Sequence, residues 1–273
     1  MANAERDYVL GTHDDEIERL GIQHEVWQAR AMAAWQRAGF KAGQTVLDVG
    51  SGPGYATLDI ASMVGEHGRV IAVDRSRRFL DTLESRRKRR GLENVDVIES
   101  DLDDVKFGSN IADGAWCRWV LAFVMRPRQL LEKIAGALKP GGVFVSHEYF
   151  DYASWRSMPP SPLFAEFVQA TIRHWRKSGG EPDIGLEVPR WLEEMGFTIE
   201  SVTPIVDVIT PQDFAWQWPT SFMDVGLTRL LDLGAIDRSR EAEFRDALNA
   251  VASIESMRMI TPGLLEVIAR KVG

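Results

Sequence analysis

The chain has 273 residues, of which 45% are hydrophobic, so it can bury one large α/β core with added segments. Its formal net charge of −8 argues against general affinity for nucleic acids or anionic membranes. The single cysteine, Cys117, cannot form an internal disulfide, and we find neither a transmembrane-length apolar run nor a signal-peptide pattern, so we expect a soluble cytoplasmic protein.

The first predicted helix covers residues 14–38. Its apolar residues recur at helical spacing, acids occupy its first turn, and Gly39 closes its end. Gly21 weakens the middle of this pattern and predicts a break there. Upstream, Tyr8 opens a short apolar patch, and one interpretation of this patch is an arm that packs on the core.

A glycine-rich turn follows the first predicted strand, residues 45–49. Glycine stands at every second position, at Gly50, Gly52 and Gly54. Glycine tolerates positive φ and lets a bound molecule approach the backbone, and the next helix turns its free N–H groups toward the same space. This pattern favours a nucleotide-like ligand, and the alternative is an ordinary connection between a strand and a helix.

The second predicted strand, residues 70–74, ends in Asp74. An acid at this strand tip can accept hydrogen bonds from both ribose hydroxyls of an adenosine. Its alternative role is to cap the helix predicted over residues 77–90, but Ser76 is better placed for that cap. We therefore expect Asp74 to be free for the ligand. The basic end of the same helix, residues 86–90, is interpreted as a solvated terminus rather than a nucleic-acid site.

Three more strands and a helix complete the first half of the chain. The alternation of apolar residues predicts strands over 95–99 and 113–121. The next helix begins at Pro127, a favoured residue for a first helical turn. The turn 138–142, with a proline followed by two glycines, stops this helix before a fifth strand that begins at Val143.

The second half of the chain alternates helices and strands less regularly. The predicted elements are helices over 163–178 and 186–195, a strand over 197–206, an aromatic-rich helical insertion over about 211–256, and a last strand over 264–269. Ligands of open α/β sheets bind beyond the carboxyl ends of the strands, so the segment 147–155 is expected to wall the pocket. The expected division is an N-terminal helical arm or lid (1–40), a ligand-binding core (41–150), a helical substrate-side segment (151–196) and a final part with two strands and the insertion (197–273).

The spacing Asp48-x-Gly50-x-Gly52-x-Gly54 resembles motif I of the class I S-adenosylmethionine (SAM) dependent methyltransferases of small molecules. The acids downstream and the turn 138–142 follow in the order of that family, and the resemblance covers about residues 44–150. It implies a Rossmann-like α/β fold with a seven-stranded, mostly parallel sheet, an antiparallel last strand, helices on both faces and a helical lid insertion. The dinucleotide fingerprint G-x-G-x-x-G fits less well, because its third glycine would fall on Tyr55.

The resemblance also implies a SAM site. The acid in the position of Asp101 accepts a hydrogen bond from the adenine amine, and the backbone N–H of Leu102 reaches a ring nitrogen. The next two acids, Asp103 and Asp104, are expected to be exposed. Arg118 and Trp119 occupy the tip of the fourth strand, which faces the methionine part, and the segment with Tyr8 folds over the cofactor. The residues expected to bind SAM and its product S-adenosyl-L-homocysteine are Tyr8, Asp48, Gly50, Ser51, Gly52, Gly54, Asp74, Arg75, Ser76, Asp101, Leu102, Arg118 and Trp119.

The methyl acceptor is expected to bind among aromatic side chains. The aromatic residues of the insertion form the small core of a lid, an apolar acceptor pocket, or both. Alignment of donor and acceptor can contribute about 7–11 kcal/mol, so a general base is optional. The candidate bases are Glu148, His147 and His174, and only one of the first two can serve because they alternate along a strand. The expected acceptor-pocket residues are Phe123, Tyr149, Trp155 and Phe222.

These features predict a SAM-dependent methyltransferase that acts on an O, N or C nucleophile of a small organic acceptor. The Asn/Asp-Pro-Pro-Tyr signature of amide and base N-methyltransferases is absent, and no histidines are paired at metal-ligand spacing. We therefore expect no metal and no nucleic-acid or membrane partner, and a monomer or a homodimer. The alternatives are a catalytically silent SAM-binding regulatory protein and an NAD(P)-dependent oxidoreductase.

Overall fold

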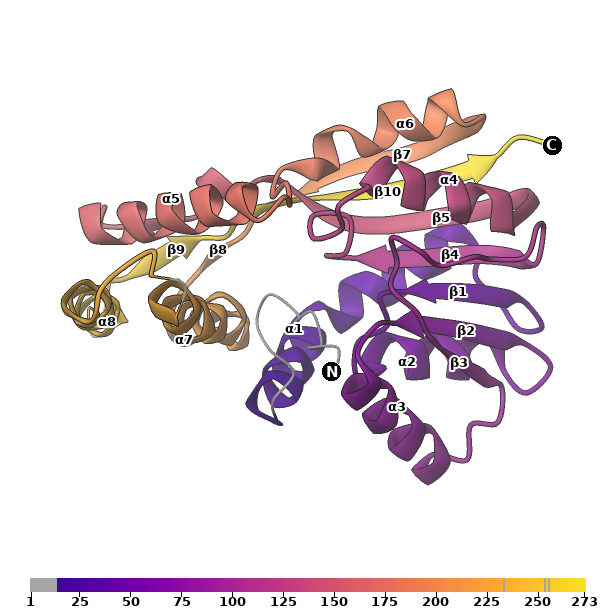
Figure 1. The fold of residues 1–273 in the computed structure, drawn as a ribbon, viewed down its shortest axis with the longest axis horizontal. Helices are drawn as coiled ribbons and strands as arrows, with labels where there is room; N and C mark the ends of the chain where they lie inside the picture. Colours follow the sequence, from indigo (N-terminus) through magenta and orange to yellow (C-terminus); the bar gives the residue numbers. More distant parts are fainter. Residues whose placement is uncertain (1–13, 233, 253, 255) are drawn as a thin grey trace, which may run out of the picture.

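A seven-stranded sheet organises the structure, which is a computed structural model describing residues 14–232, 234–252, 254 and 256–273 (Figure 1). The strand order is β3-β2-β1-β4-β5-β10-β7. Neighbouring strands pair in parallel except β10, which runs antiparallel to both β5 and β7. The predicted fold class is therefore confirmed. The strands are β1 (Thr45–Val49), β2 (Arg69–Asp74), β3 (Val95–Glu99), β4 (Ala112–Arg118), β5 (Leu138–Asp151), β7 (Phe197–Ile205) and β10 (Gly263–Lys271).

Both faces of this sheet are covered by helices, as the near-continuous apolar runs of the central strands require. In β1, Leu47 and Val49 belong to the core on one face and Val46 to the core on the other, because successive side chains point to opposite faces. Figure 1 shows a first set of helices on one face and a second set on the other. The first set is α1 (Asp14–Ala38), α2 (Tyr55–Val64) and α3 (Arg77–Arg89), and the second is α4 (Pro127–Ala137) and α6 (Val188–Glu194).

Two predicted helix starts are confirmed, and one predicted turn is corrected. Ser76 caps α3, since its Oγ accepts a hydrogen bond from the Phe79 N–H at 3.3 Å, and Pro127 lies in the first turn of α4. The turn 138–142 is an irregular stretch within β5 rather than a separate loop. The register against β4 shifts there, and Gly141 adopts a φ of +77° that favours glycine.

Helix α1 runs unbroken through Gly21, so the predicted break is wrong. A Cβ at Gly21 would lie 2.6 Å from the Tyr55 hydroxyl, which in turn donates a hydrogen bond to the Ile17 carbonyl at 2.9 Å. Glycine therefore lets α1 approach the first residue of α2 closely. Within the described part of the chain, no helix combines the length and the apolar character that a membrane span needs.

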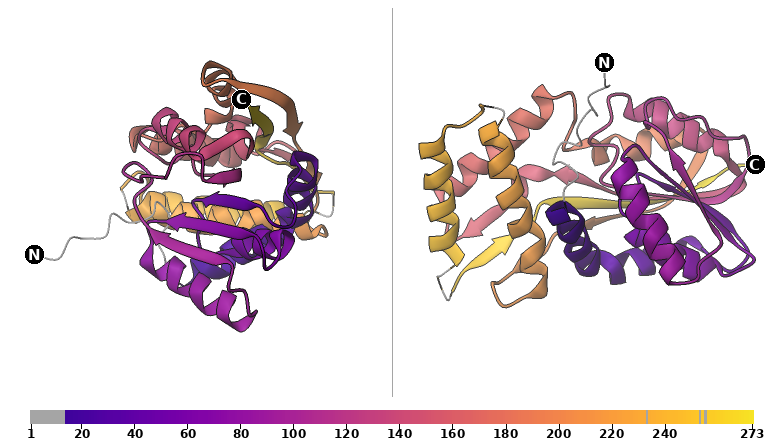
Figure 2. Two further views of the ribbon diagram at one scale, coloured as in Figure 1. Left: turned by 90° about the vertical axis from the view of Figure 1, so that its right-hand side faces the viewer. Right: turned by 60° about the horizontal axis from the view of Figure 1, so that its bottom comes forward.

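A second, smaller lobe lies beyond the carboxyl ends of the parallel strands (Figures 1 and 2). Its helices α7 and α8 lie side by side and cover the predicted insertion. Its three-stranded sheet, in the order β6-β9-β8, was not predicted, because strands of two or three residues carry no readable alternation. The elements are η1 (Tyr152–Ser154), β6 (Arg156–Met158), α5 (Pro162–Lys177), η2 (Ile184–Leu186), β8 (Val208–Ile209), η3 (Phe214–Trp216), α7 (Gln217–Asp232), α8 (Arg238–Ala252) and β9 (Arg258–Ile260).

A cluster of aromatic rings joins this lobe to the sheet. The ring of Trp119, just after β4, stacks on Trp218 of α7 at 5.7 Å and on Tyr149 of β5 at 5.8 Å between centroids. Trp27 of α1 meets Trp119 and Trp218 edge-on at 5.4 and 4.9 Å. These contacts fix α1 and α7 over the carboxyl ends of the central strands.

Candidate functional site

A cavity of about 650 Å³ lies at the carboxyl ends of β1, β2 and β4. Asp48, Asp74 and Arg118, one from each of these strands, line it, and α1, α5 and α7 complete its wall. Open α/β sheets bind their ligands in this position, because the strand tips present polar groups and helix N-termini there.

The three glycines after β1 have different roles at this cavity. All three adopt positive φ, at +73° for Gly50, +54° for Gly52 and +84° for Gly54. A Cβ at Gly50 would lie 2.3 Å from Val120, and one at Gly54 would lie 2.2 Å from Leu83, so these two glycines allow close packing. A Cβ at Gly52 meets nothing within 4 Å. Gly52 therefore presents bare backbone to the cavity, where a ligand can lie against it.

Asp74 holds the glycine turn in place, which corrects the prediction that it is free. Its Oδ2 accepts a hydrogen bond from the Gly52 N–H at 2.9 Å, and its Oδ1 accepts one from the Ser76 N–H at 2.9 Å. Burial raises the pKa of this carboxyl, and these backbone hydrogen bonds oppose the shift. Each carboxylate oxygen has a second acceptor site, so Asp74 can still bind two ribose hydroxyls.

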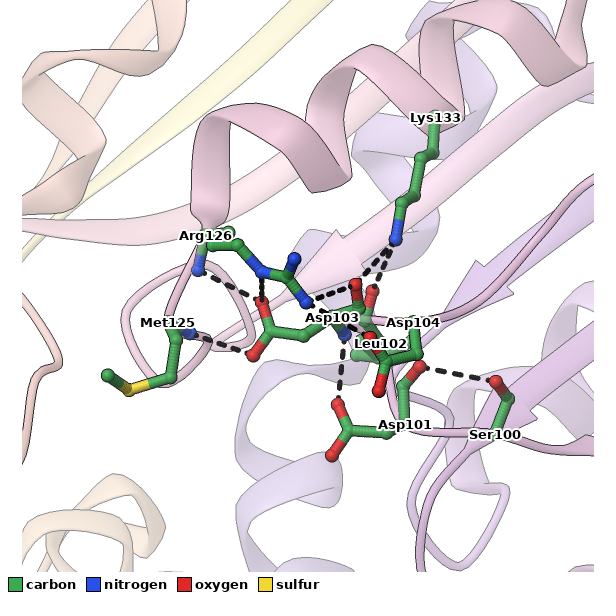
Figure 3. Close-up of polar contacts among 8 residues, drawn as sticks. All are labelled: Ser100, Asp101, Leu102, Asp103, Asp104, Met125, Arg126 and Lys133. Atoms are coloured by element: carbon green, nitrogen blue, oxygen red, sulfur yellow. Dashed lines mark hydrogen bonds and ion pairs between the residues drawn. The ribbon is translucent and has the colours of Figure 1, made fainter.

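Of the acids after β3, Asp101 and Asp103 line the cavity. Asp103 also ties two loops together (Figure 3). Asp103 accepts hydrogen bonds from the backbone N–H groups of Met125 and Arg126 at 3.1 and 3.0 Å, and its side chain is 16% exposed. The prediction of exposure is therefore wrong for Asp103, although Asp104 is 79% exposed. Among the described residues, the carboxylate of Asp101 accepts one hydrogen bond, from the Asp103 N–H to Oδ1 at 2.9 Å. Its other oxygen is in position to accept a ligand donor.

A buried cation at the tip of β4 is incompletely paired. Arg118 donates through Nη2 to the Nδ1 of His24 at 3.2 Å, and its buried Nη1 has no hydrogen-bond partner among the described residues. Burial lowers the pKa of Arg118 to about 10. Because the guanidinium can only donate, His24 carries its proton on Nε2 and donates to Asp59 at 2.9 Å. His24 and Arg118 both line the cavity.

Two further polar groups face the same end of the cavity. Asp48 accepts a hydrogen bond from the Thr57 hydroxyl at 2.5 Å, and burial raises the pKa of its carboxyl to about 6. The buried Ser51 Oγ has no partner among the described residues. A cation, a carboxylate and an unsatisfied hydroxyl therefore surround this end, which fits a ligand with a zwitterionic amino-acid group such as that of SAM.

The opposite wall of the cavity, which we call the acceptor end, comes from residues after β4 and from the smaller lobe. Phe123 stacks on Trp175 of α5 at 4.4 Å between centroids, and the Trp175 Nε1 donates to the Ala122 carbonyl at 2.9 Å. These contacts fix the loop 119–125 against α5. The acceptor end consists of Trp119, Phe123, Val124, Met125, Ser178 and Arg229.

Most of the predicted cofactor residues meet at the cavity. Gly54 and Ser76 lie behind its wall, where they precede α2 and α3, and Tyr8 lies outside the described residues. The predicted residues that line it are Asp48, Gly50, Ser51, Gly52, Asp74, Arg75, Asp101, Leu102, Arg118 and Trp119.

Of the four predicted acceptor-pocket residues, Phe123 lines the cavity. The other three pack behind it. Tyr149 supports the ring of Trp119, Trp155 donates its Nε1 hydrogen to the sulfur of Met259 at 3.0 Å, and Phe222 packs against Trp155 at 6.1 Å between centroids. We therefore correct their assignment from the pocket to its supporting core.

The candidate bases do not lie among the described residues that line the cavity. Glu148 Oε1 accepts hydrogen bonds from the N–H groups of Val120 and Leu121 at 2.8 and 2.9 Å, and burial raises its pKa to about 7. The buried His147 pairs with Glu266 at 3.0 Å, and burial lowers the pKa of the imidazole. Both side chains hold the loop and the strands behind the cavity, so we withdraw them as bases.

Sequence reasoning missed cavity residues on elements far from the glycine turn. Leu20, Gln23 and His24 line it from α1, Ser178 lines it just after α5, and Arg229 lines it from α7. The helical spacing of residues 20, 23 and 24 is a signal that they share one face of α1. No local pattern marks Arg229, because only the packing of α7 brings it to the cavity.

Comparisons with known proteins agree with this site. A methyltransferase-domain family model matches residues 47–146. The demethylmenaquinone methyltransferase of Staphylococcus saprophyticus is 29% identical over 144 residues, which are 53% of this chain and 57% of that protein. The chain spans about half the length of the curated relatives it matches.

Solved structures of related fold cover more of the chain. Geranyl diphosphate C-methyltransferase from Streptomyces coelicolor, in complex with Mg²⁺, geranyl diphosphate and S-adenosyl-L-homocysteine, has a TM-score of 0.57 at 16% identity over 91% of this chain and 80% of that one. The cyclase SpnF has a TM-score of 0.60 at 19% identity over 90% of this chain and 82% of that one. At these identities the two structures establish the shared fold and leave the reaction open. Together with the order of the motifs, the matched domain shows that residues 47–146 are similar to class I SAM-dependent methyltransferases.

Proposed function

We propose that this chain transfers a methyl group from SAM to an O, N or C nucleophile on a small organic acceptor. The observation that carries the proposal is that one cavity has two unlike walls. The donor wall consists of the residues that match the family motifs, and the acceptor end is aromatic and comes partly from α5 and α7, outside the matched residues 47–146.

The donor wall has a partner for each part of the cofactor. Asp74 and Asp101 line the cavity, and we expect them to accept hydrogen bonds from the ribose hydroxyls and from the adenine amine. Arg118 and Asp48 offer opposite charges for the α-carboxylate and the α-ammonium group of the methionine part, and the Ser51 hydroxyl adds an unsatisfied polar group beside them. When bound, SAM supplies a methyl group that its sulfonium has already made electrophilic.

The chain's own contribution to the reaction is then to orient the acceptor and to exclude water. Trp119 and Phe123 provide flat apolar surfaces against which an acceptor can be aligned. The histidine at the cavity, His24, accepts from Arg118 and donates to Asp59, so its lone pair is not free to take a proton. Alignment alone can contribute about 7–11 kcal/mol, which makes a dedicated base unnecessary.

The names of the relatives support a small acceptor. They are methyltransferases of demethylmenaquinone and of geranyl diphosphate, both small organic molecules. We extend the proposal to the division of the chain: α1 covers the donor wall, and the segments 151–196 and 211–256 select the acceptor. An NAD(P)-dependent oxidoreductase is disfavoured because Tyr55 occupies the third position of the dinucleotide fingerprint.

Two measurements test this function. Titration calorimetry with SAM, S-adenosyl-L-homocysteine and NAD is expected to show binding of the first two, and binding of NAD alone would overturn the proposal. Transfer of a labelled methyl group from SAM to members of a metabolite panel is expected for an enzyme. If SAM binds but the label reaches no acceptor, the result favours a catalytically silent SAM-binding protein.

A further inference from the structure

Arg229 on α7 is a cation at the acceptor end without a structural partner in the described part of the chain. Its side chain is half-buried, its Nε is fully buried, and neither a hydrogen bond nor an ion pair to a described residue satisfies the guanidinium. A buried N–H without an acceptor costs free energy that a native fold rarely leaves uncompensated. Arg229 also lines the cavity, where a bound anion can pair with the rest of its guanidinium.

Three acids on the elements that form this end of the cavity are engaged elsewhere. Asp224, also on α7, pairs with Arg245 at 2.9 Å. Glu181, which follows α5, pairs with Arg176 at 2.8 Å. Asp103 accepts the two backbone N–H groups of the loop after β4. None of these carboxylates contacts Arg229.

Positive charge accumulates at the end of α5 as a result. Burial lowers the pKa of His174, and the charges of Arg229 and Lys177 lower it further, with no carboxylate opposing them. Ser178, one turn after His174, lines the cavity together with Arg229. This region is therefore electropositive in a chain whose net charge is −8.

The rest of the acceptor end is apolar and aromatic. Trp119 and Phe123 offer ring faces, and Val124 and Met125 add aliphatic surface. The two Nη groups of a guanidinium can bind a carboxylate through paired, charge-assisted hydrogen bonds. A cation beside aromatic surfaces thus fits a molecule with a flat apolar body and an acidic group.

We propose that the acceptor of this chain is an aromatic or similarly flat carboxylate, whose carboxylate group binds to Arg229 and whose body lies against Trp119 and Phe123. This assignment rests on the proposed methyltransferase function and narrows its substrate class. The family match ends at residue 146, so Arg229 is a feature of this chain's own acceptor end.

Matched pairs of probes test the proposal. Benzoate and 2-naphthoate, each with its neutral carboxamide, are titrated into protein saturated with S-adenosyl-L-homocysteine, and binding is followed by calorimetry. The wild type is expected to bind each carboxylate roughly 10–100-fold more tightly than its amide, as for a charge-assisted hydrogen-bonded pair. Arg229→Gln is expected to remove this preference, and Arg229→Lys to keep part of it.

Arg238→Gln is the matched control, because Arg238 is an exposed arginine of the same lobe that lies away from the cavity lining. It is expected to keep the wild-type preference. The proposal is overturned if wild type binds the carboxylates no better than the amides or binds neither, or if Arg229→Gln keeps the preference. It is also overturned if Arg229→Gln instead weakens the binding of S-adenosyl-L-homocysteine, because that result would assign Arg229 to the donor wall. If wild type does not bind S-adenosyl-L-homocysteine, the proposed function fails, and the carboxylate preference is then measured on the protein alone.

Discussion

The two walls of the cavity differ in how they are held. On the donor wall, Asp74 accepts two backbone N–H groups and fixes the glycine turn. At the acceptor end, Asp103 ties the loop after β4 by two backbone hydrogen bonds, but the stacking of rings such as Phe123 on Trp175 holds that loop against the smaller lobe, and the cation Arg229 has no partner among the described residues. Directional hydrogen bonds suit a wall that always binds one molecule, whereas apolar packing tolerates exchange of side chains.

The difference also explains which properties of this chain can be inferred from the family match. The match covers residues 47–146, which include the strand tips of the donor wall. Ser178 and Arg229 lie beyond it. The match therefore supports the identity of the methyl donor, and the acceptor has to be argued from this chain. The variants below separate the two walls and are ordered by their expected effect on ligand binding.

The largest effect is expected from Asp74→Ala. The change removes the acceptor for the ribose hydroxyls and leaves the Gly52 N–H unpaired, so affinity for S-adenosyl-L-homocysteine is expected to fall about 100-fold, as for two lost charge-assisted hydrogen bonds. Calorimetry measures the loss. Asp81→Ala, which removes an exposed carboxylate of α3 that pairs with Arg77, is the control and is expected to bind normally. Undiminished affinity in a folded Asp74→Ala protein would contradict the ribose assignment.

A smaller donor-side effect is expected from Gly52→Ala. Gly52 and Gly65 both adopt positive φ, +54° and +67°, and a Cβ at either site meets nothing within 4 Å. Both alanine variants are expected to lose about 1–2 kcal/mol of unfolding free energy in a denaturant titration, because alanine is strained in this conformation. Only Gly52→Ala places its methyl group in the cavity, and it is expected to weaken S-adenosyl-L-homocysteine about tenfold. Equal affinities of the two variants would remove Gly52 from the donor wall.

The acceptor end is tested by Phe123→Ala. The truncation removes a ring that lines the cavity and stacks on Trp175, so binding of 2-naphthoate is expected to weaken about fivefold, or about 1 kcal/mol. Affinity for S-adenosyl-L-homocysteine is expected to stay unchanged. Phe107→Ala removes a half-buried ring that lies outside the cavity lining, and it serves as the control for lost stability. A loss of donor affinity in Phe123→Ala, with 2-naphthoate unaffected, would reverse the assignment of the two walls.

Glu148→Gln is expected to leave both walls intact and to change the pH dependence of stability. Burial raises the pKa of Glu148 to about 7 in the folded chain, above the 4.5 of an unperturbed glutamate. The folded protein therefore binds this proton more tightly than the unfolded chain does. The stability that the bound proton contributes is complete below pH 4.5, falls as the pH rises to 7 and is absent above pH 7. Glutamine cannot ionise, so the variant is expected to gain about 3 kcal/mol of unfolding free energy relative to wild type over this interval.

Urea titrations of wild type and Glu148→Gln from pH 5 to pH 8 measure this gain. Glu193→Gln, a change at an exposed glutamate of α6, is the control and is expected to follow wild type at every pH. A constant difference between Glu148→Gln and wild type across the interval would show that the folded-state pKa is ordinary. Loss of methyl transfer in a stable Glu148→Gln protein would restore Glu148 as a base.

The sequence by itself determined the sheet, the glycine turn and most of the donor wall. These features depend on neighbours in the chain: apolar runs make buried strands, positive φ selects glycine, and an acid at a strand tip faces the adjoining turn. Ser76 follows from such a local rule, and Asp101 was expected from the resemblance to the family. The same rules misjudged Asp74, because its bond to the Gly52 N–H crosses between two strands.

Only the tertiary structure decided what faces the cavity from a distance. His24 and Arg118 are 94 residues apart and meet at 3.2 Å, and Trp119 stacks on Trp218 of the smaller lobe. The same packing of α7 that positions Trp218 brings Arg229 to the acceptor end. Contacts with the loop after β4 and with β10 hold Glu148 and His147 behind the wall. Side-chain packing between distant segments has no local signature in the sequence, so the methyl donor could be predicted from the sequence and the acceptor end could not.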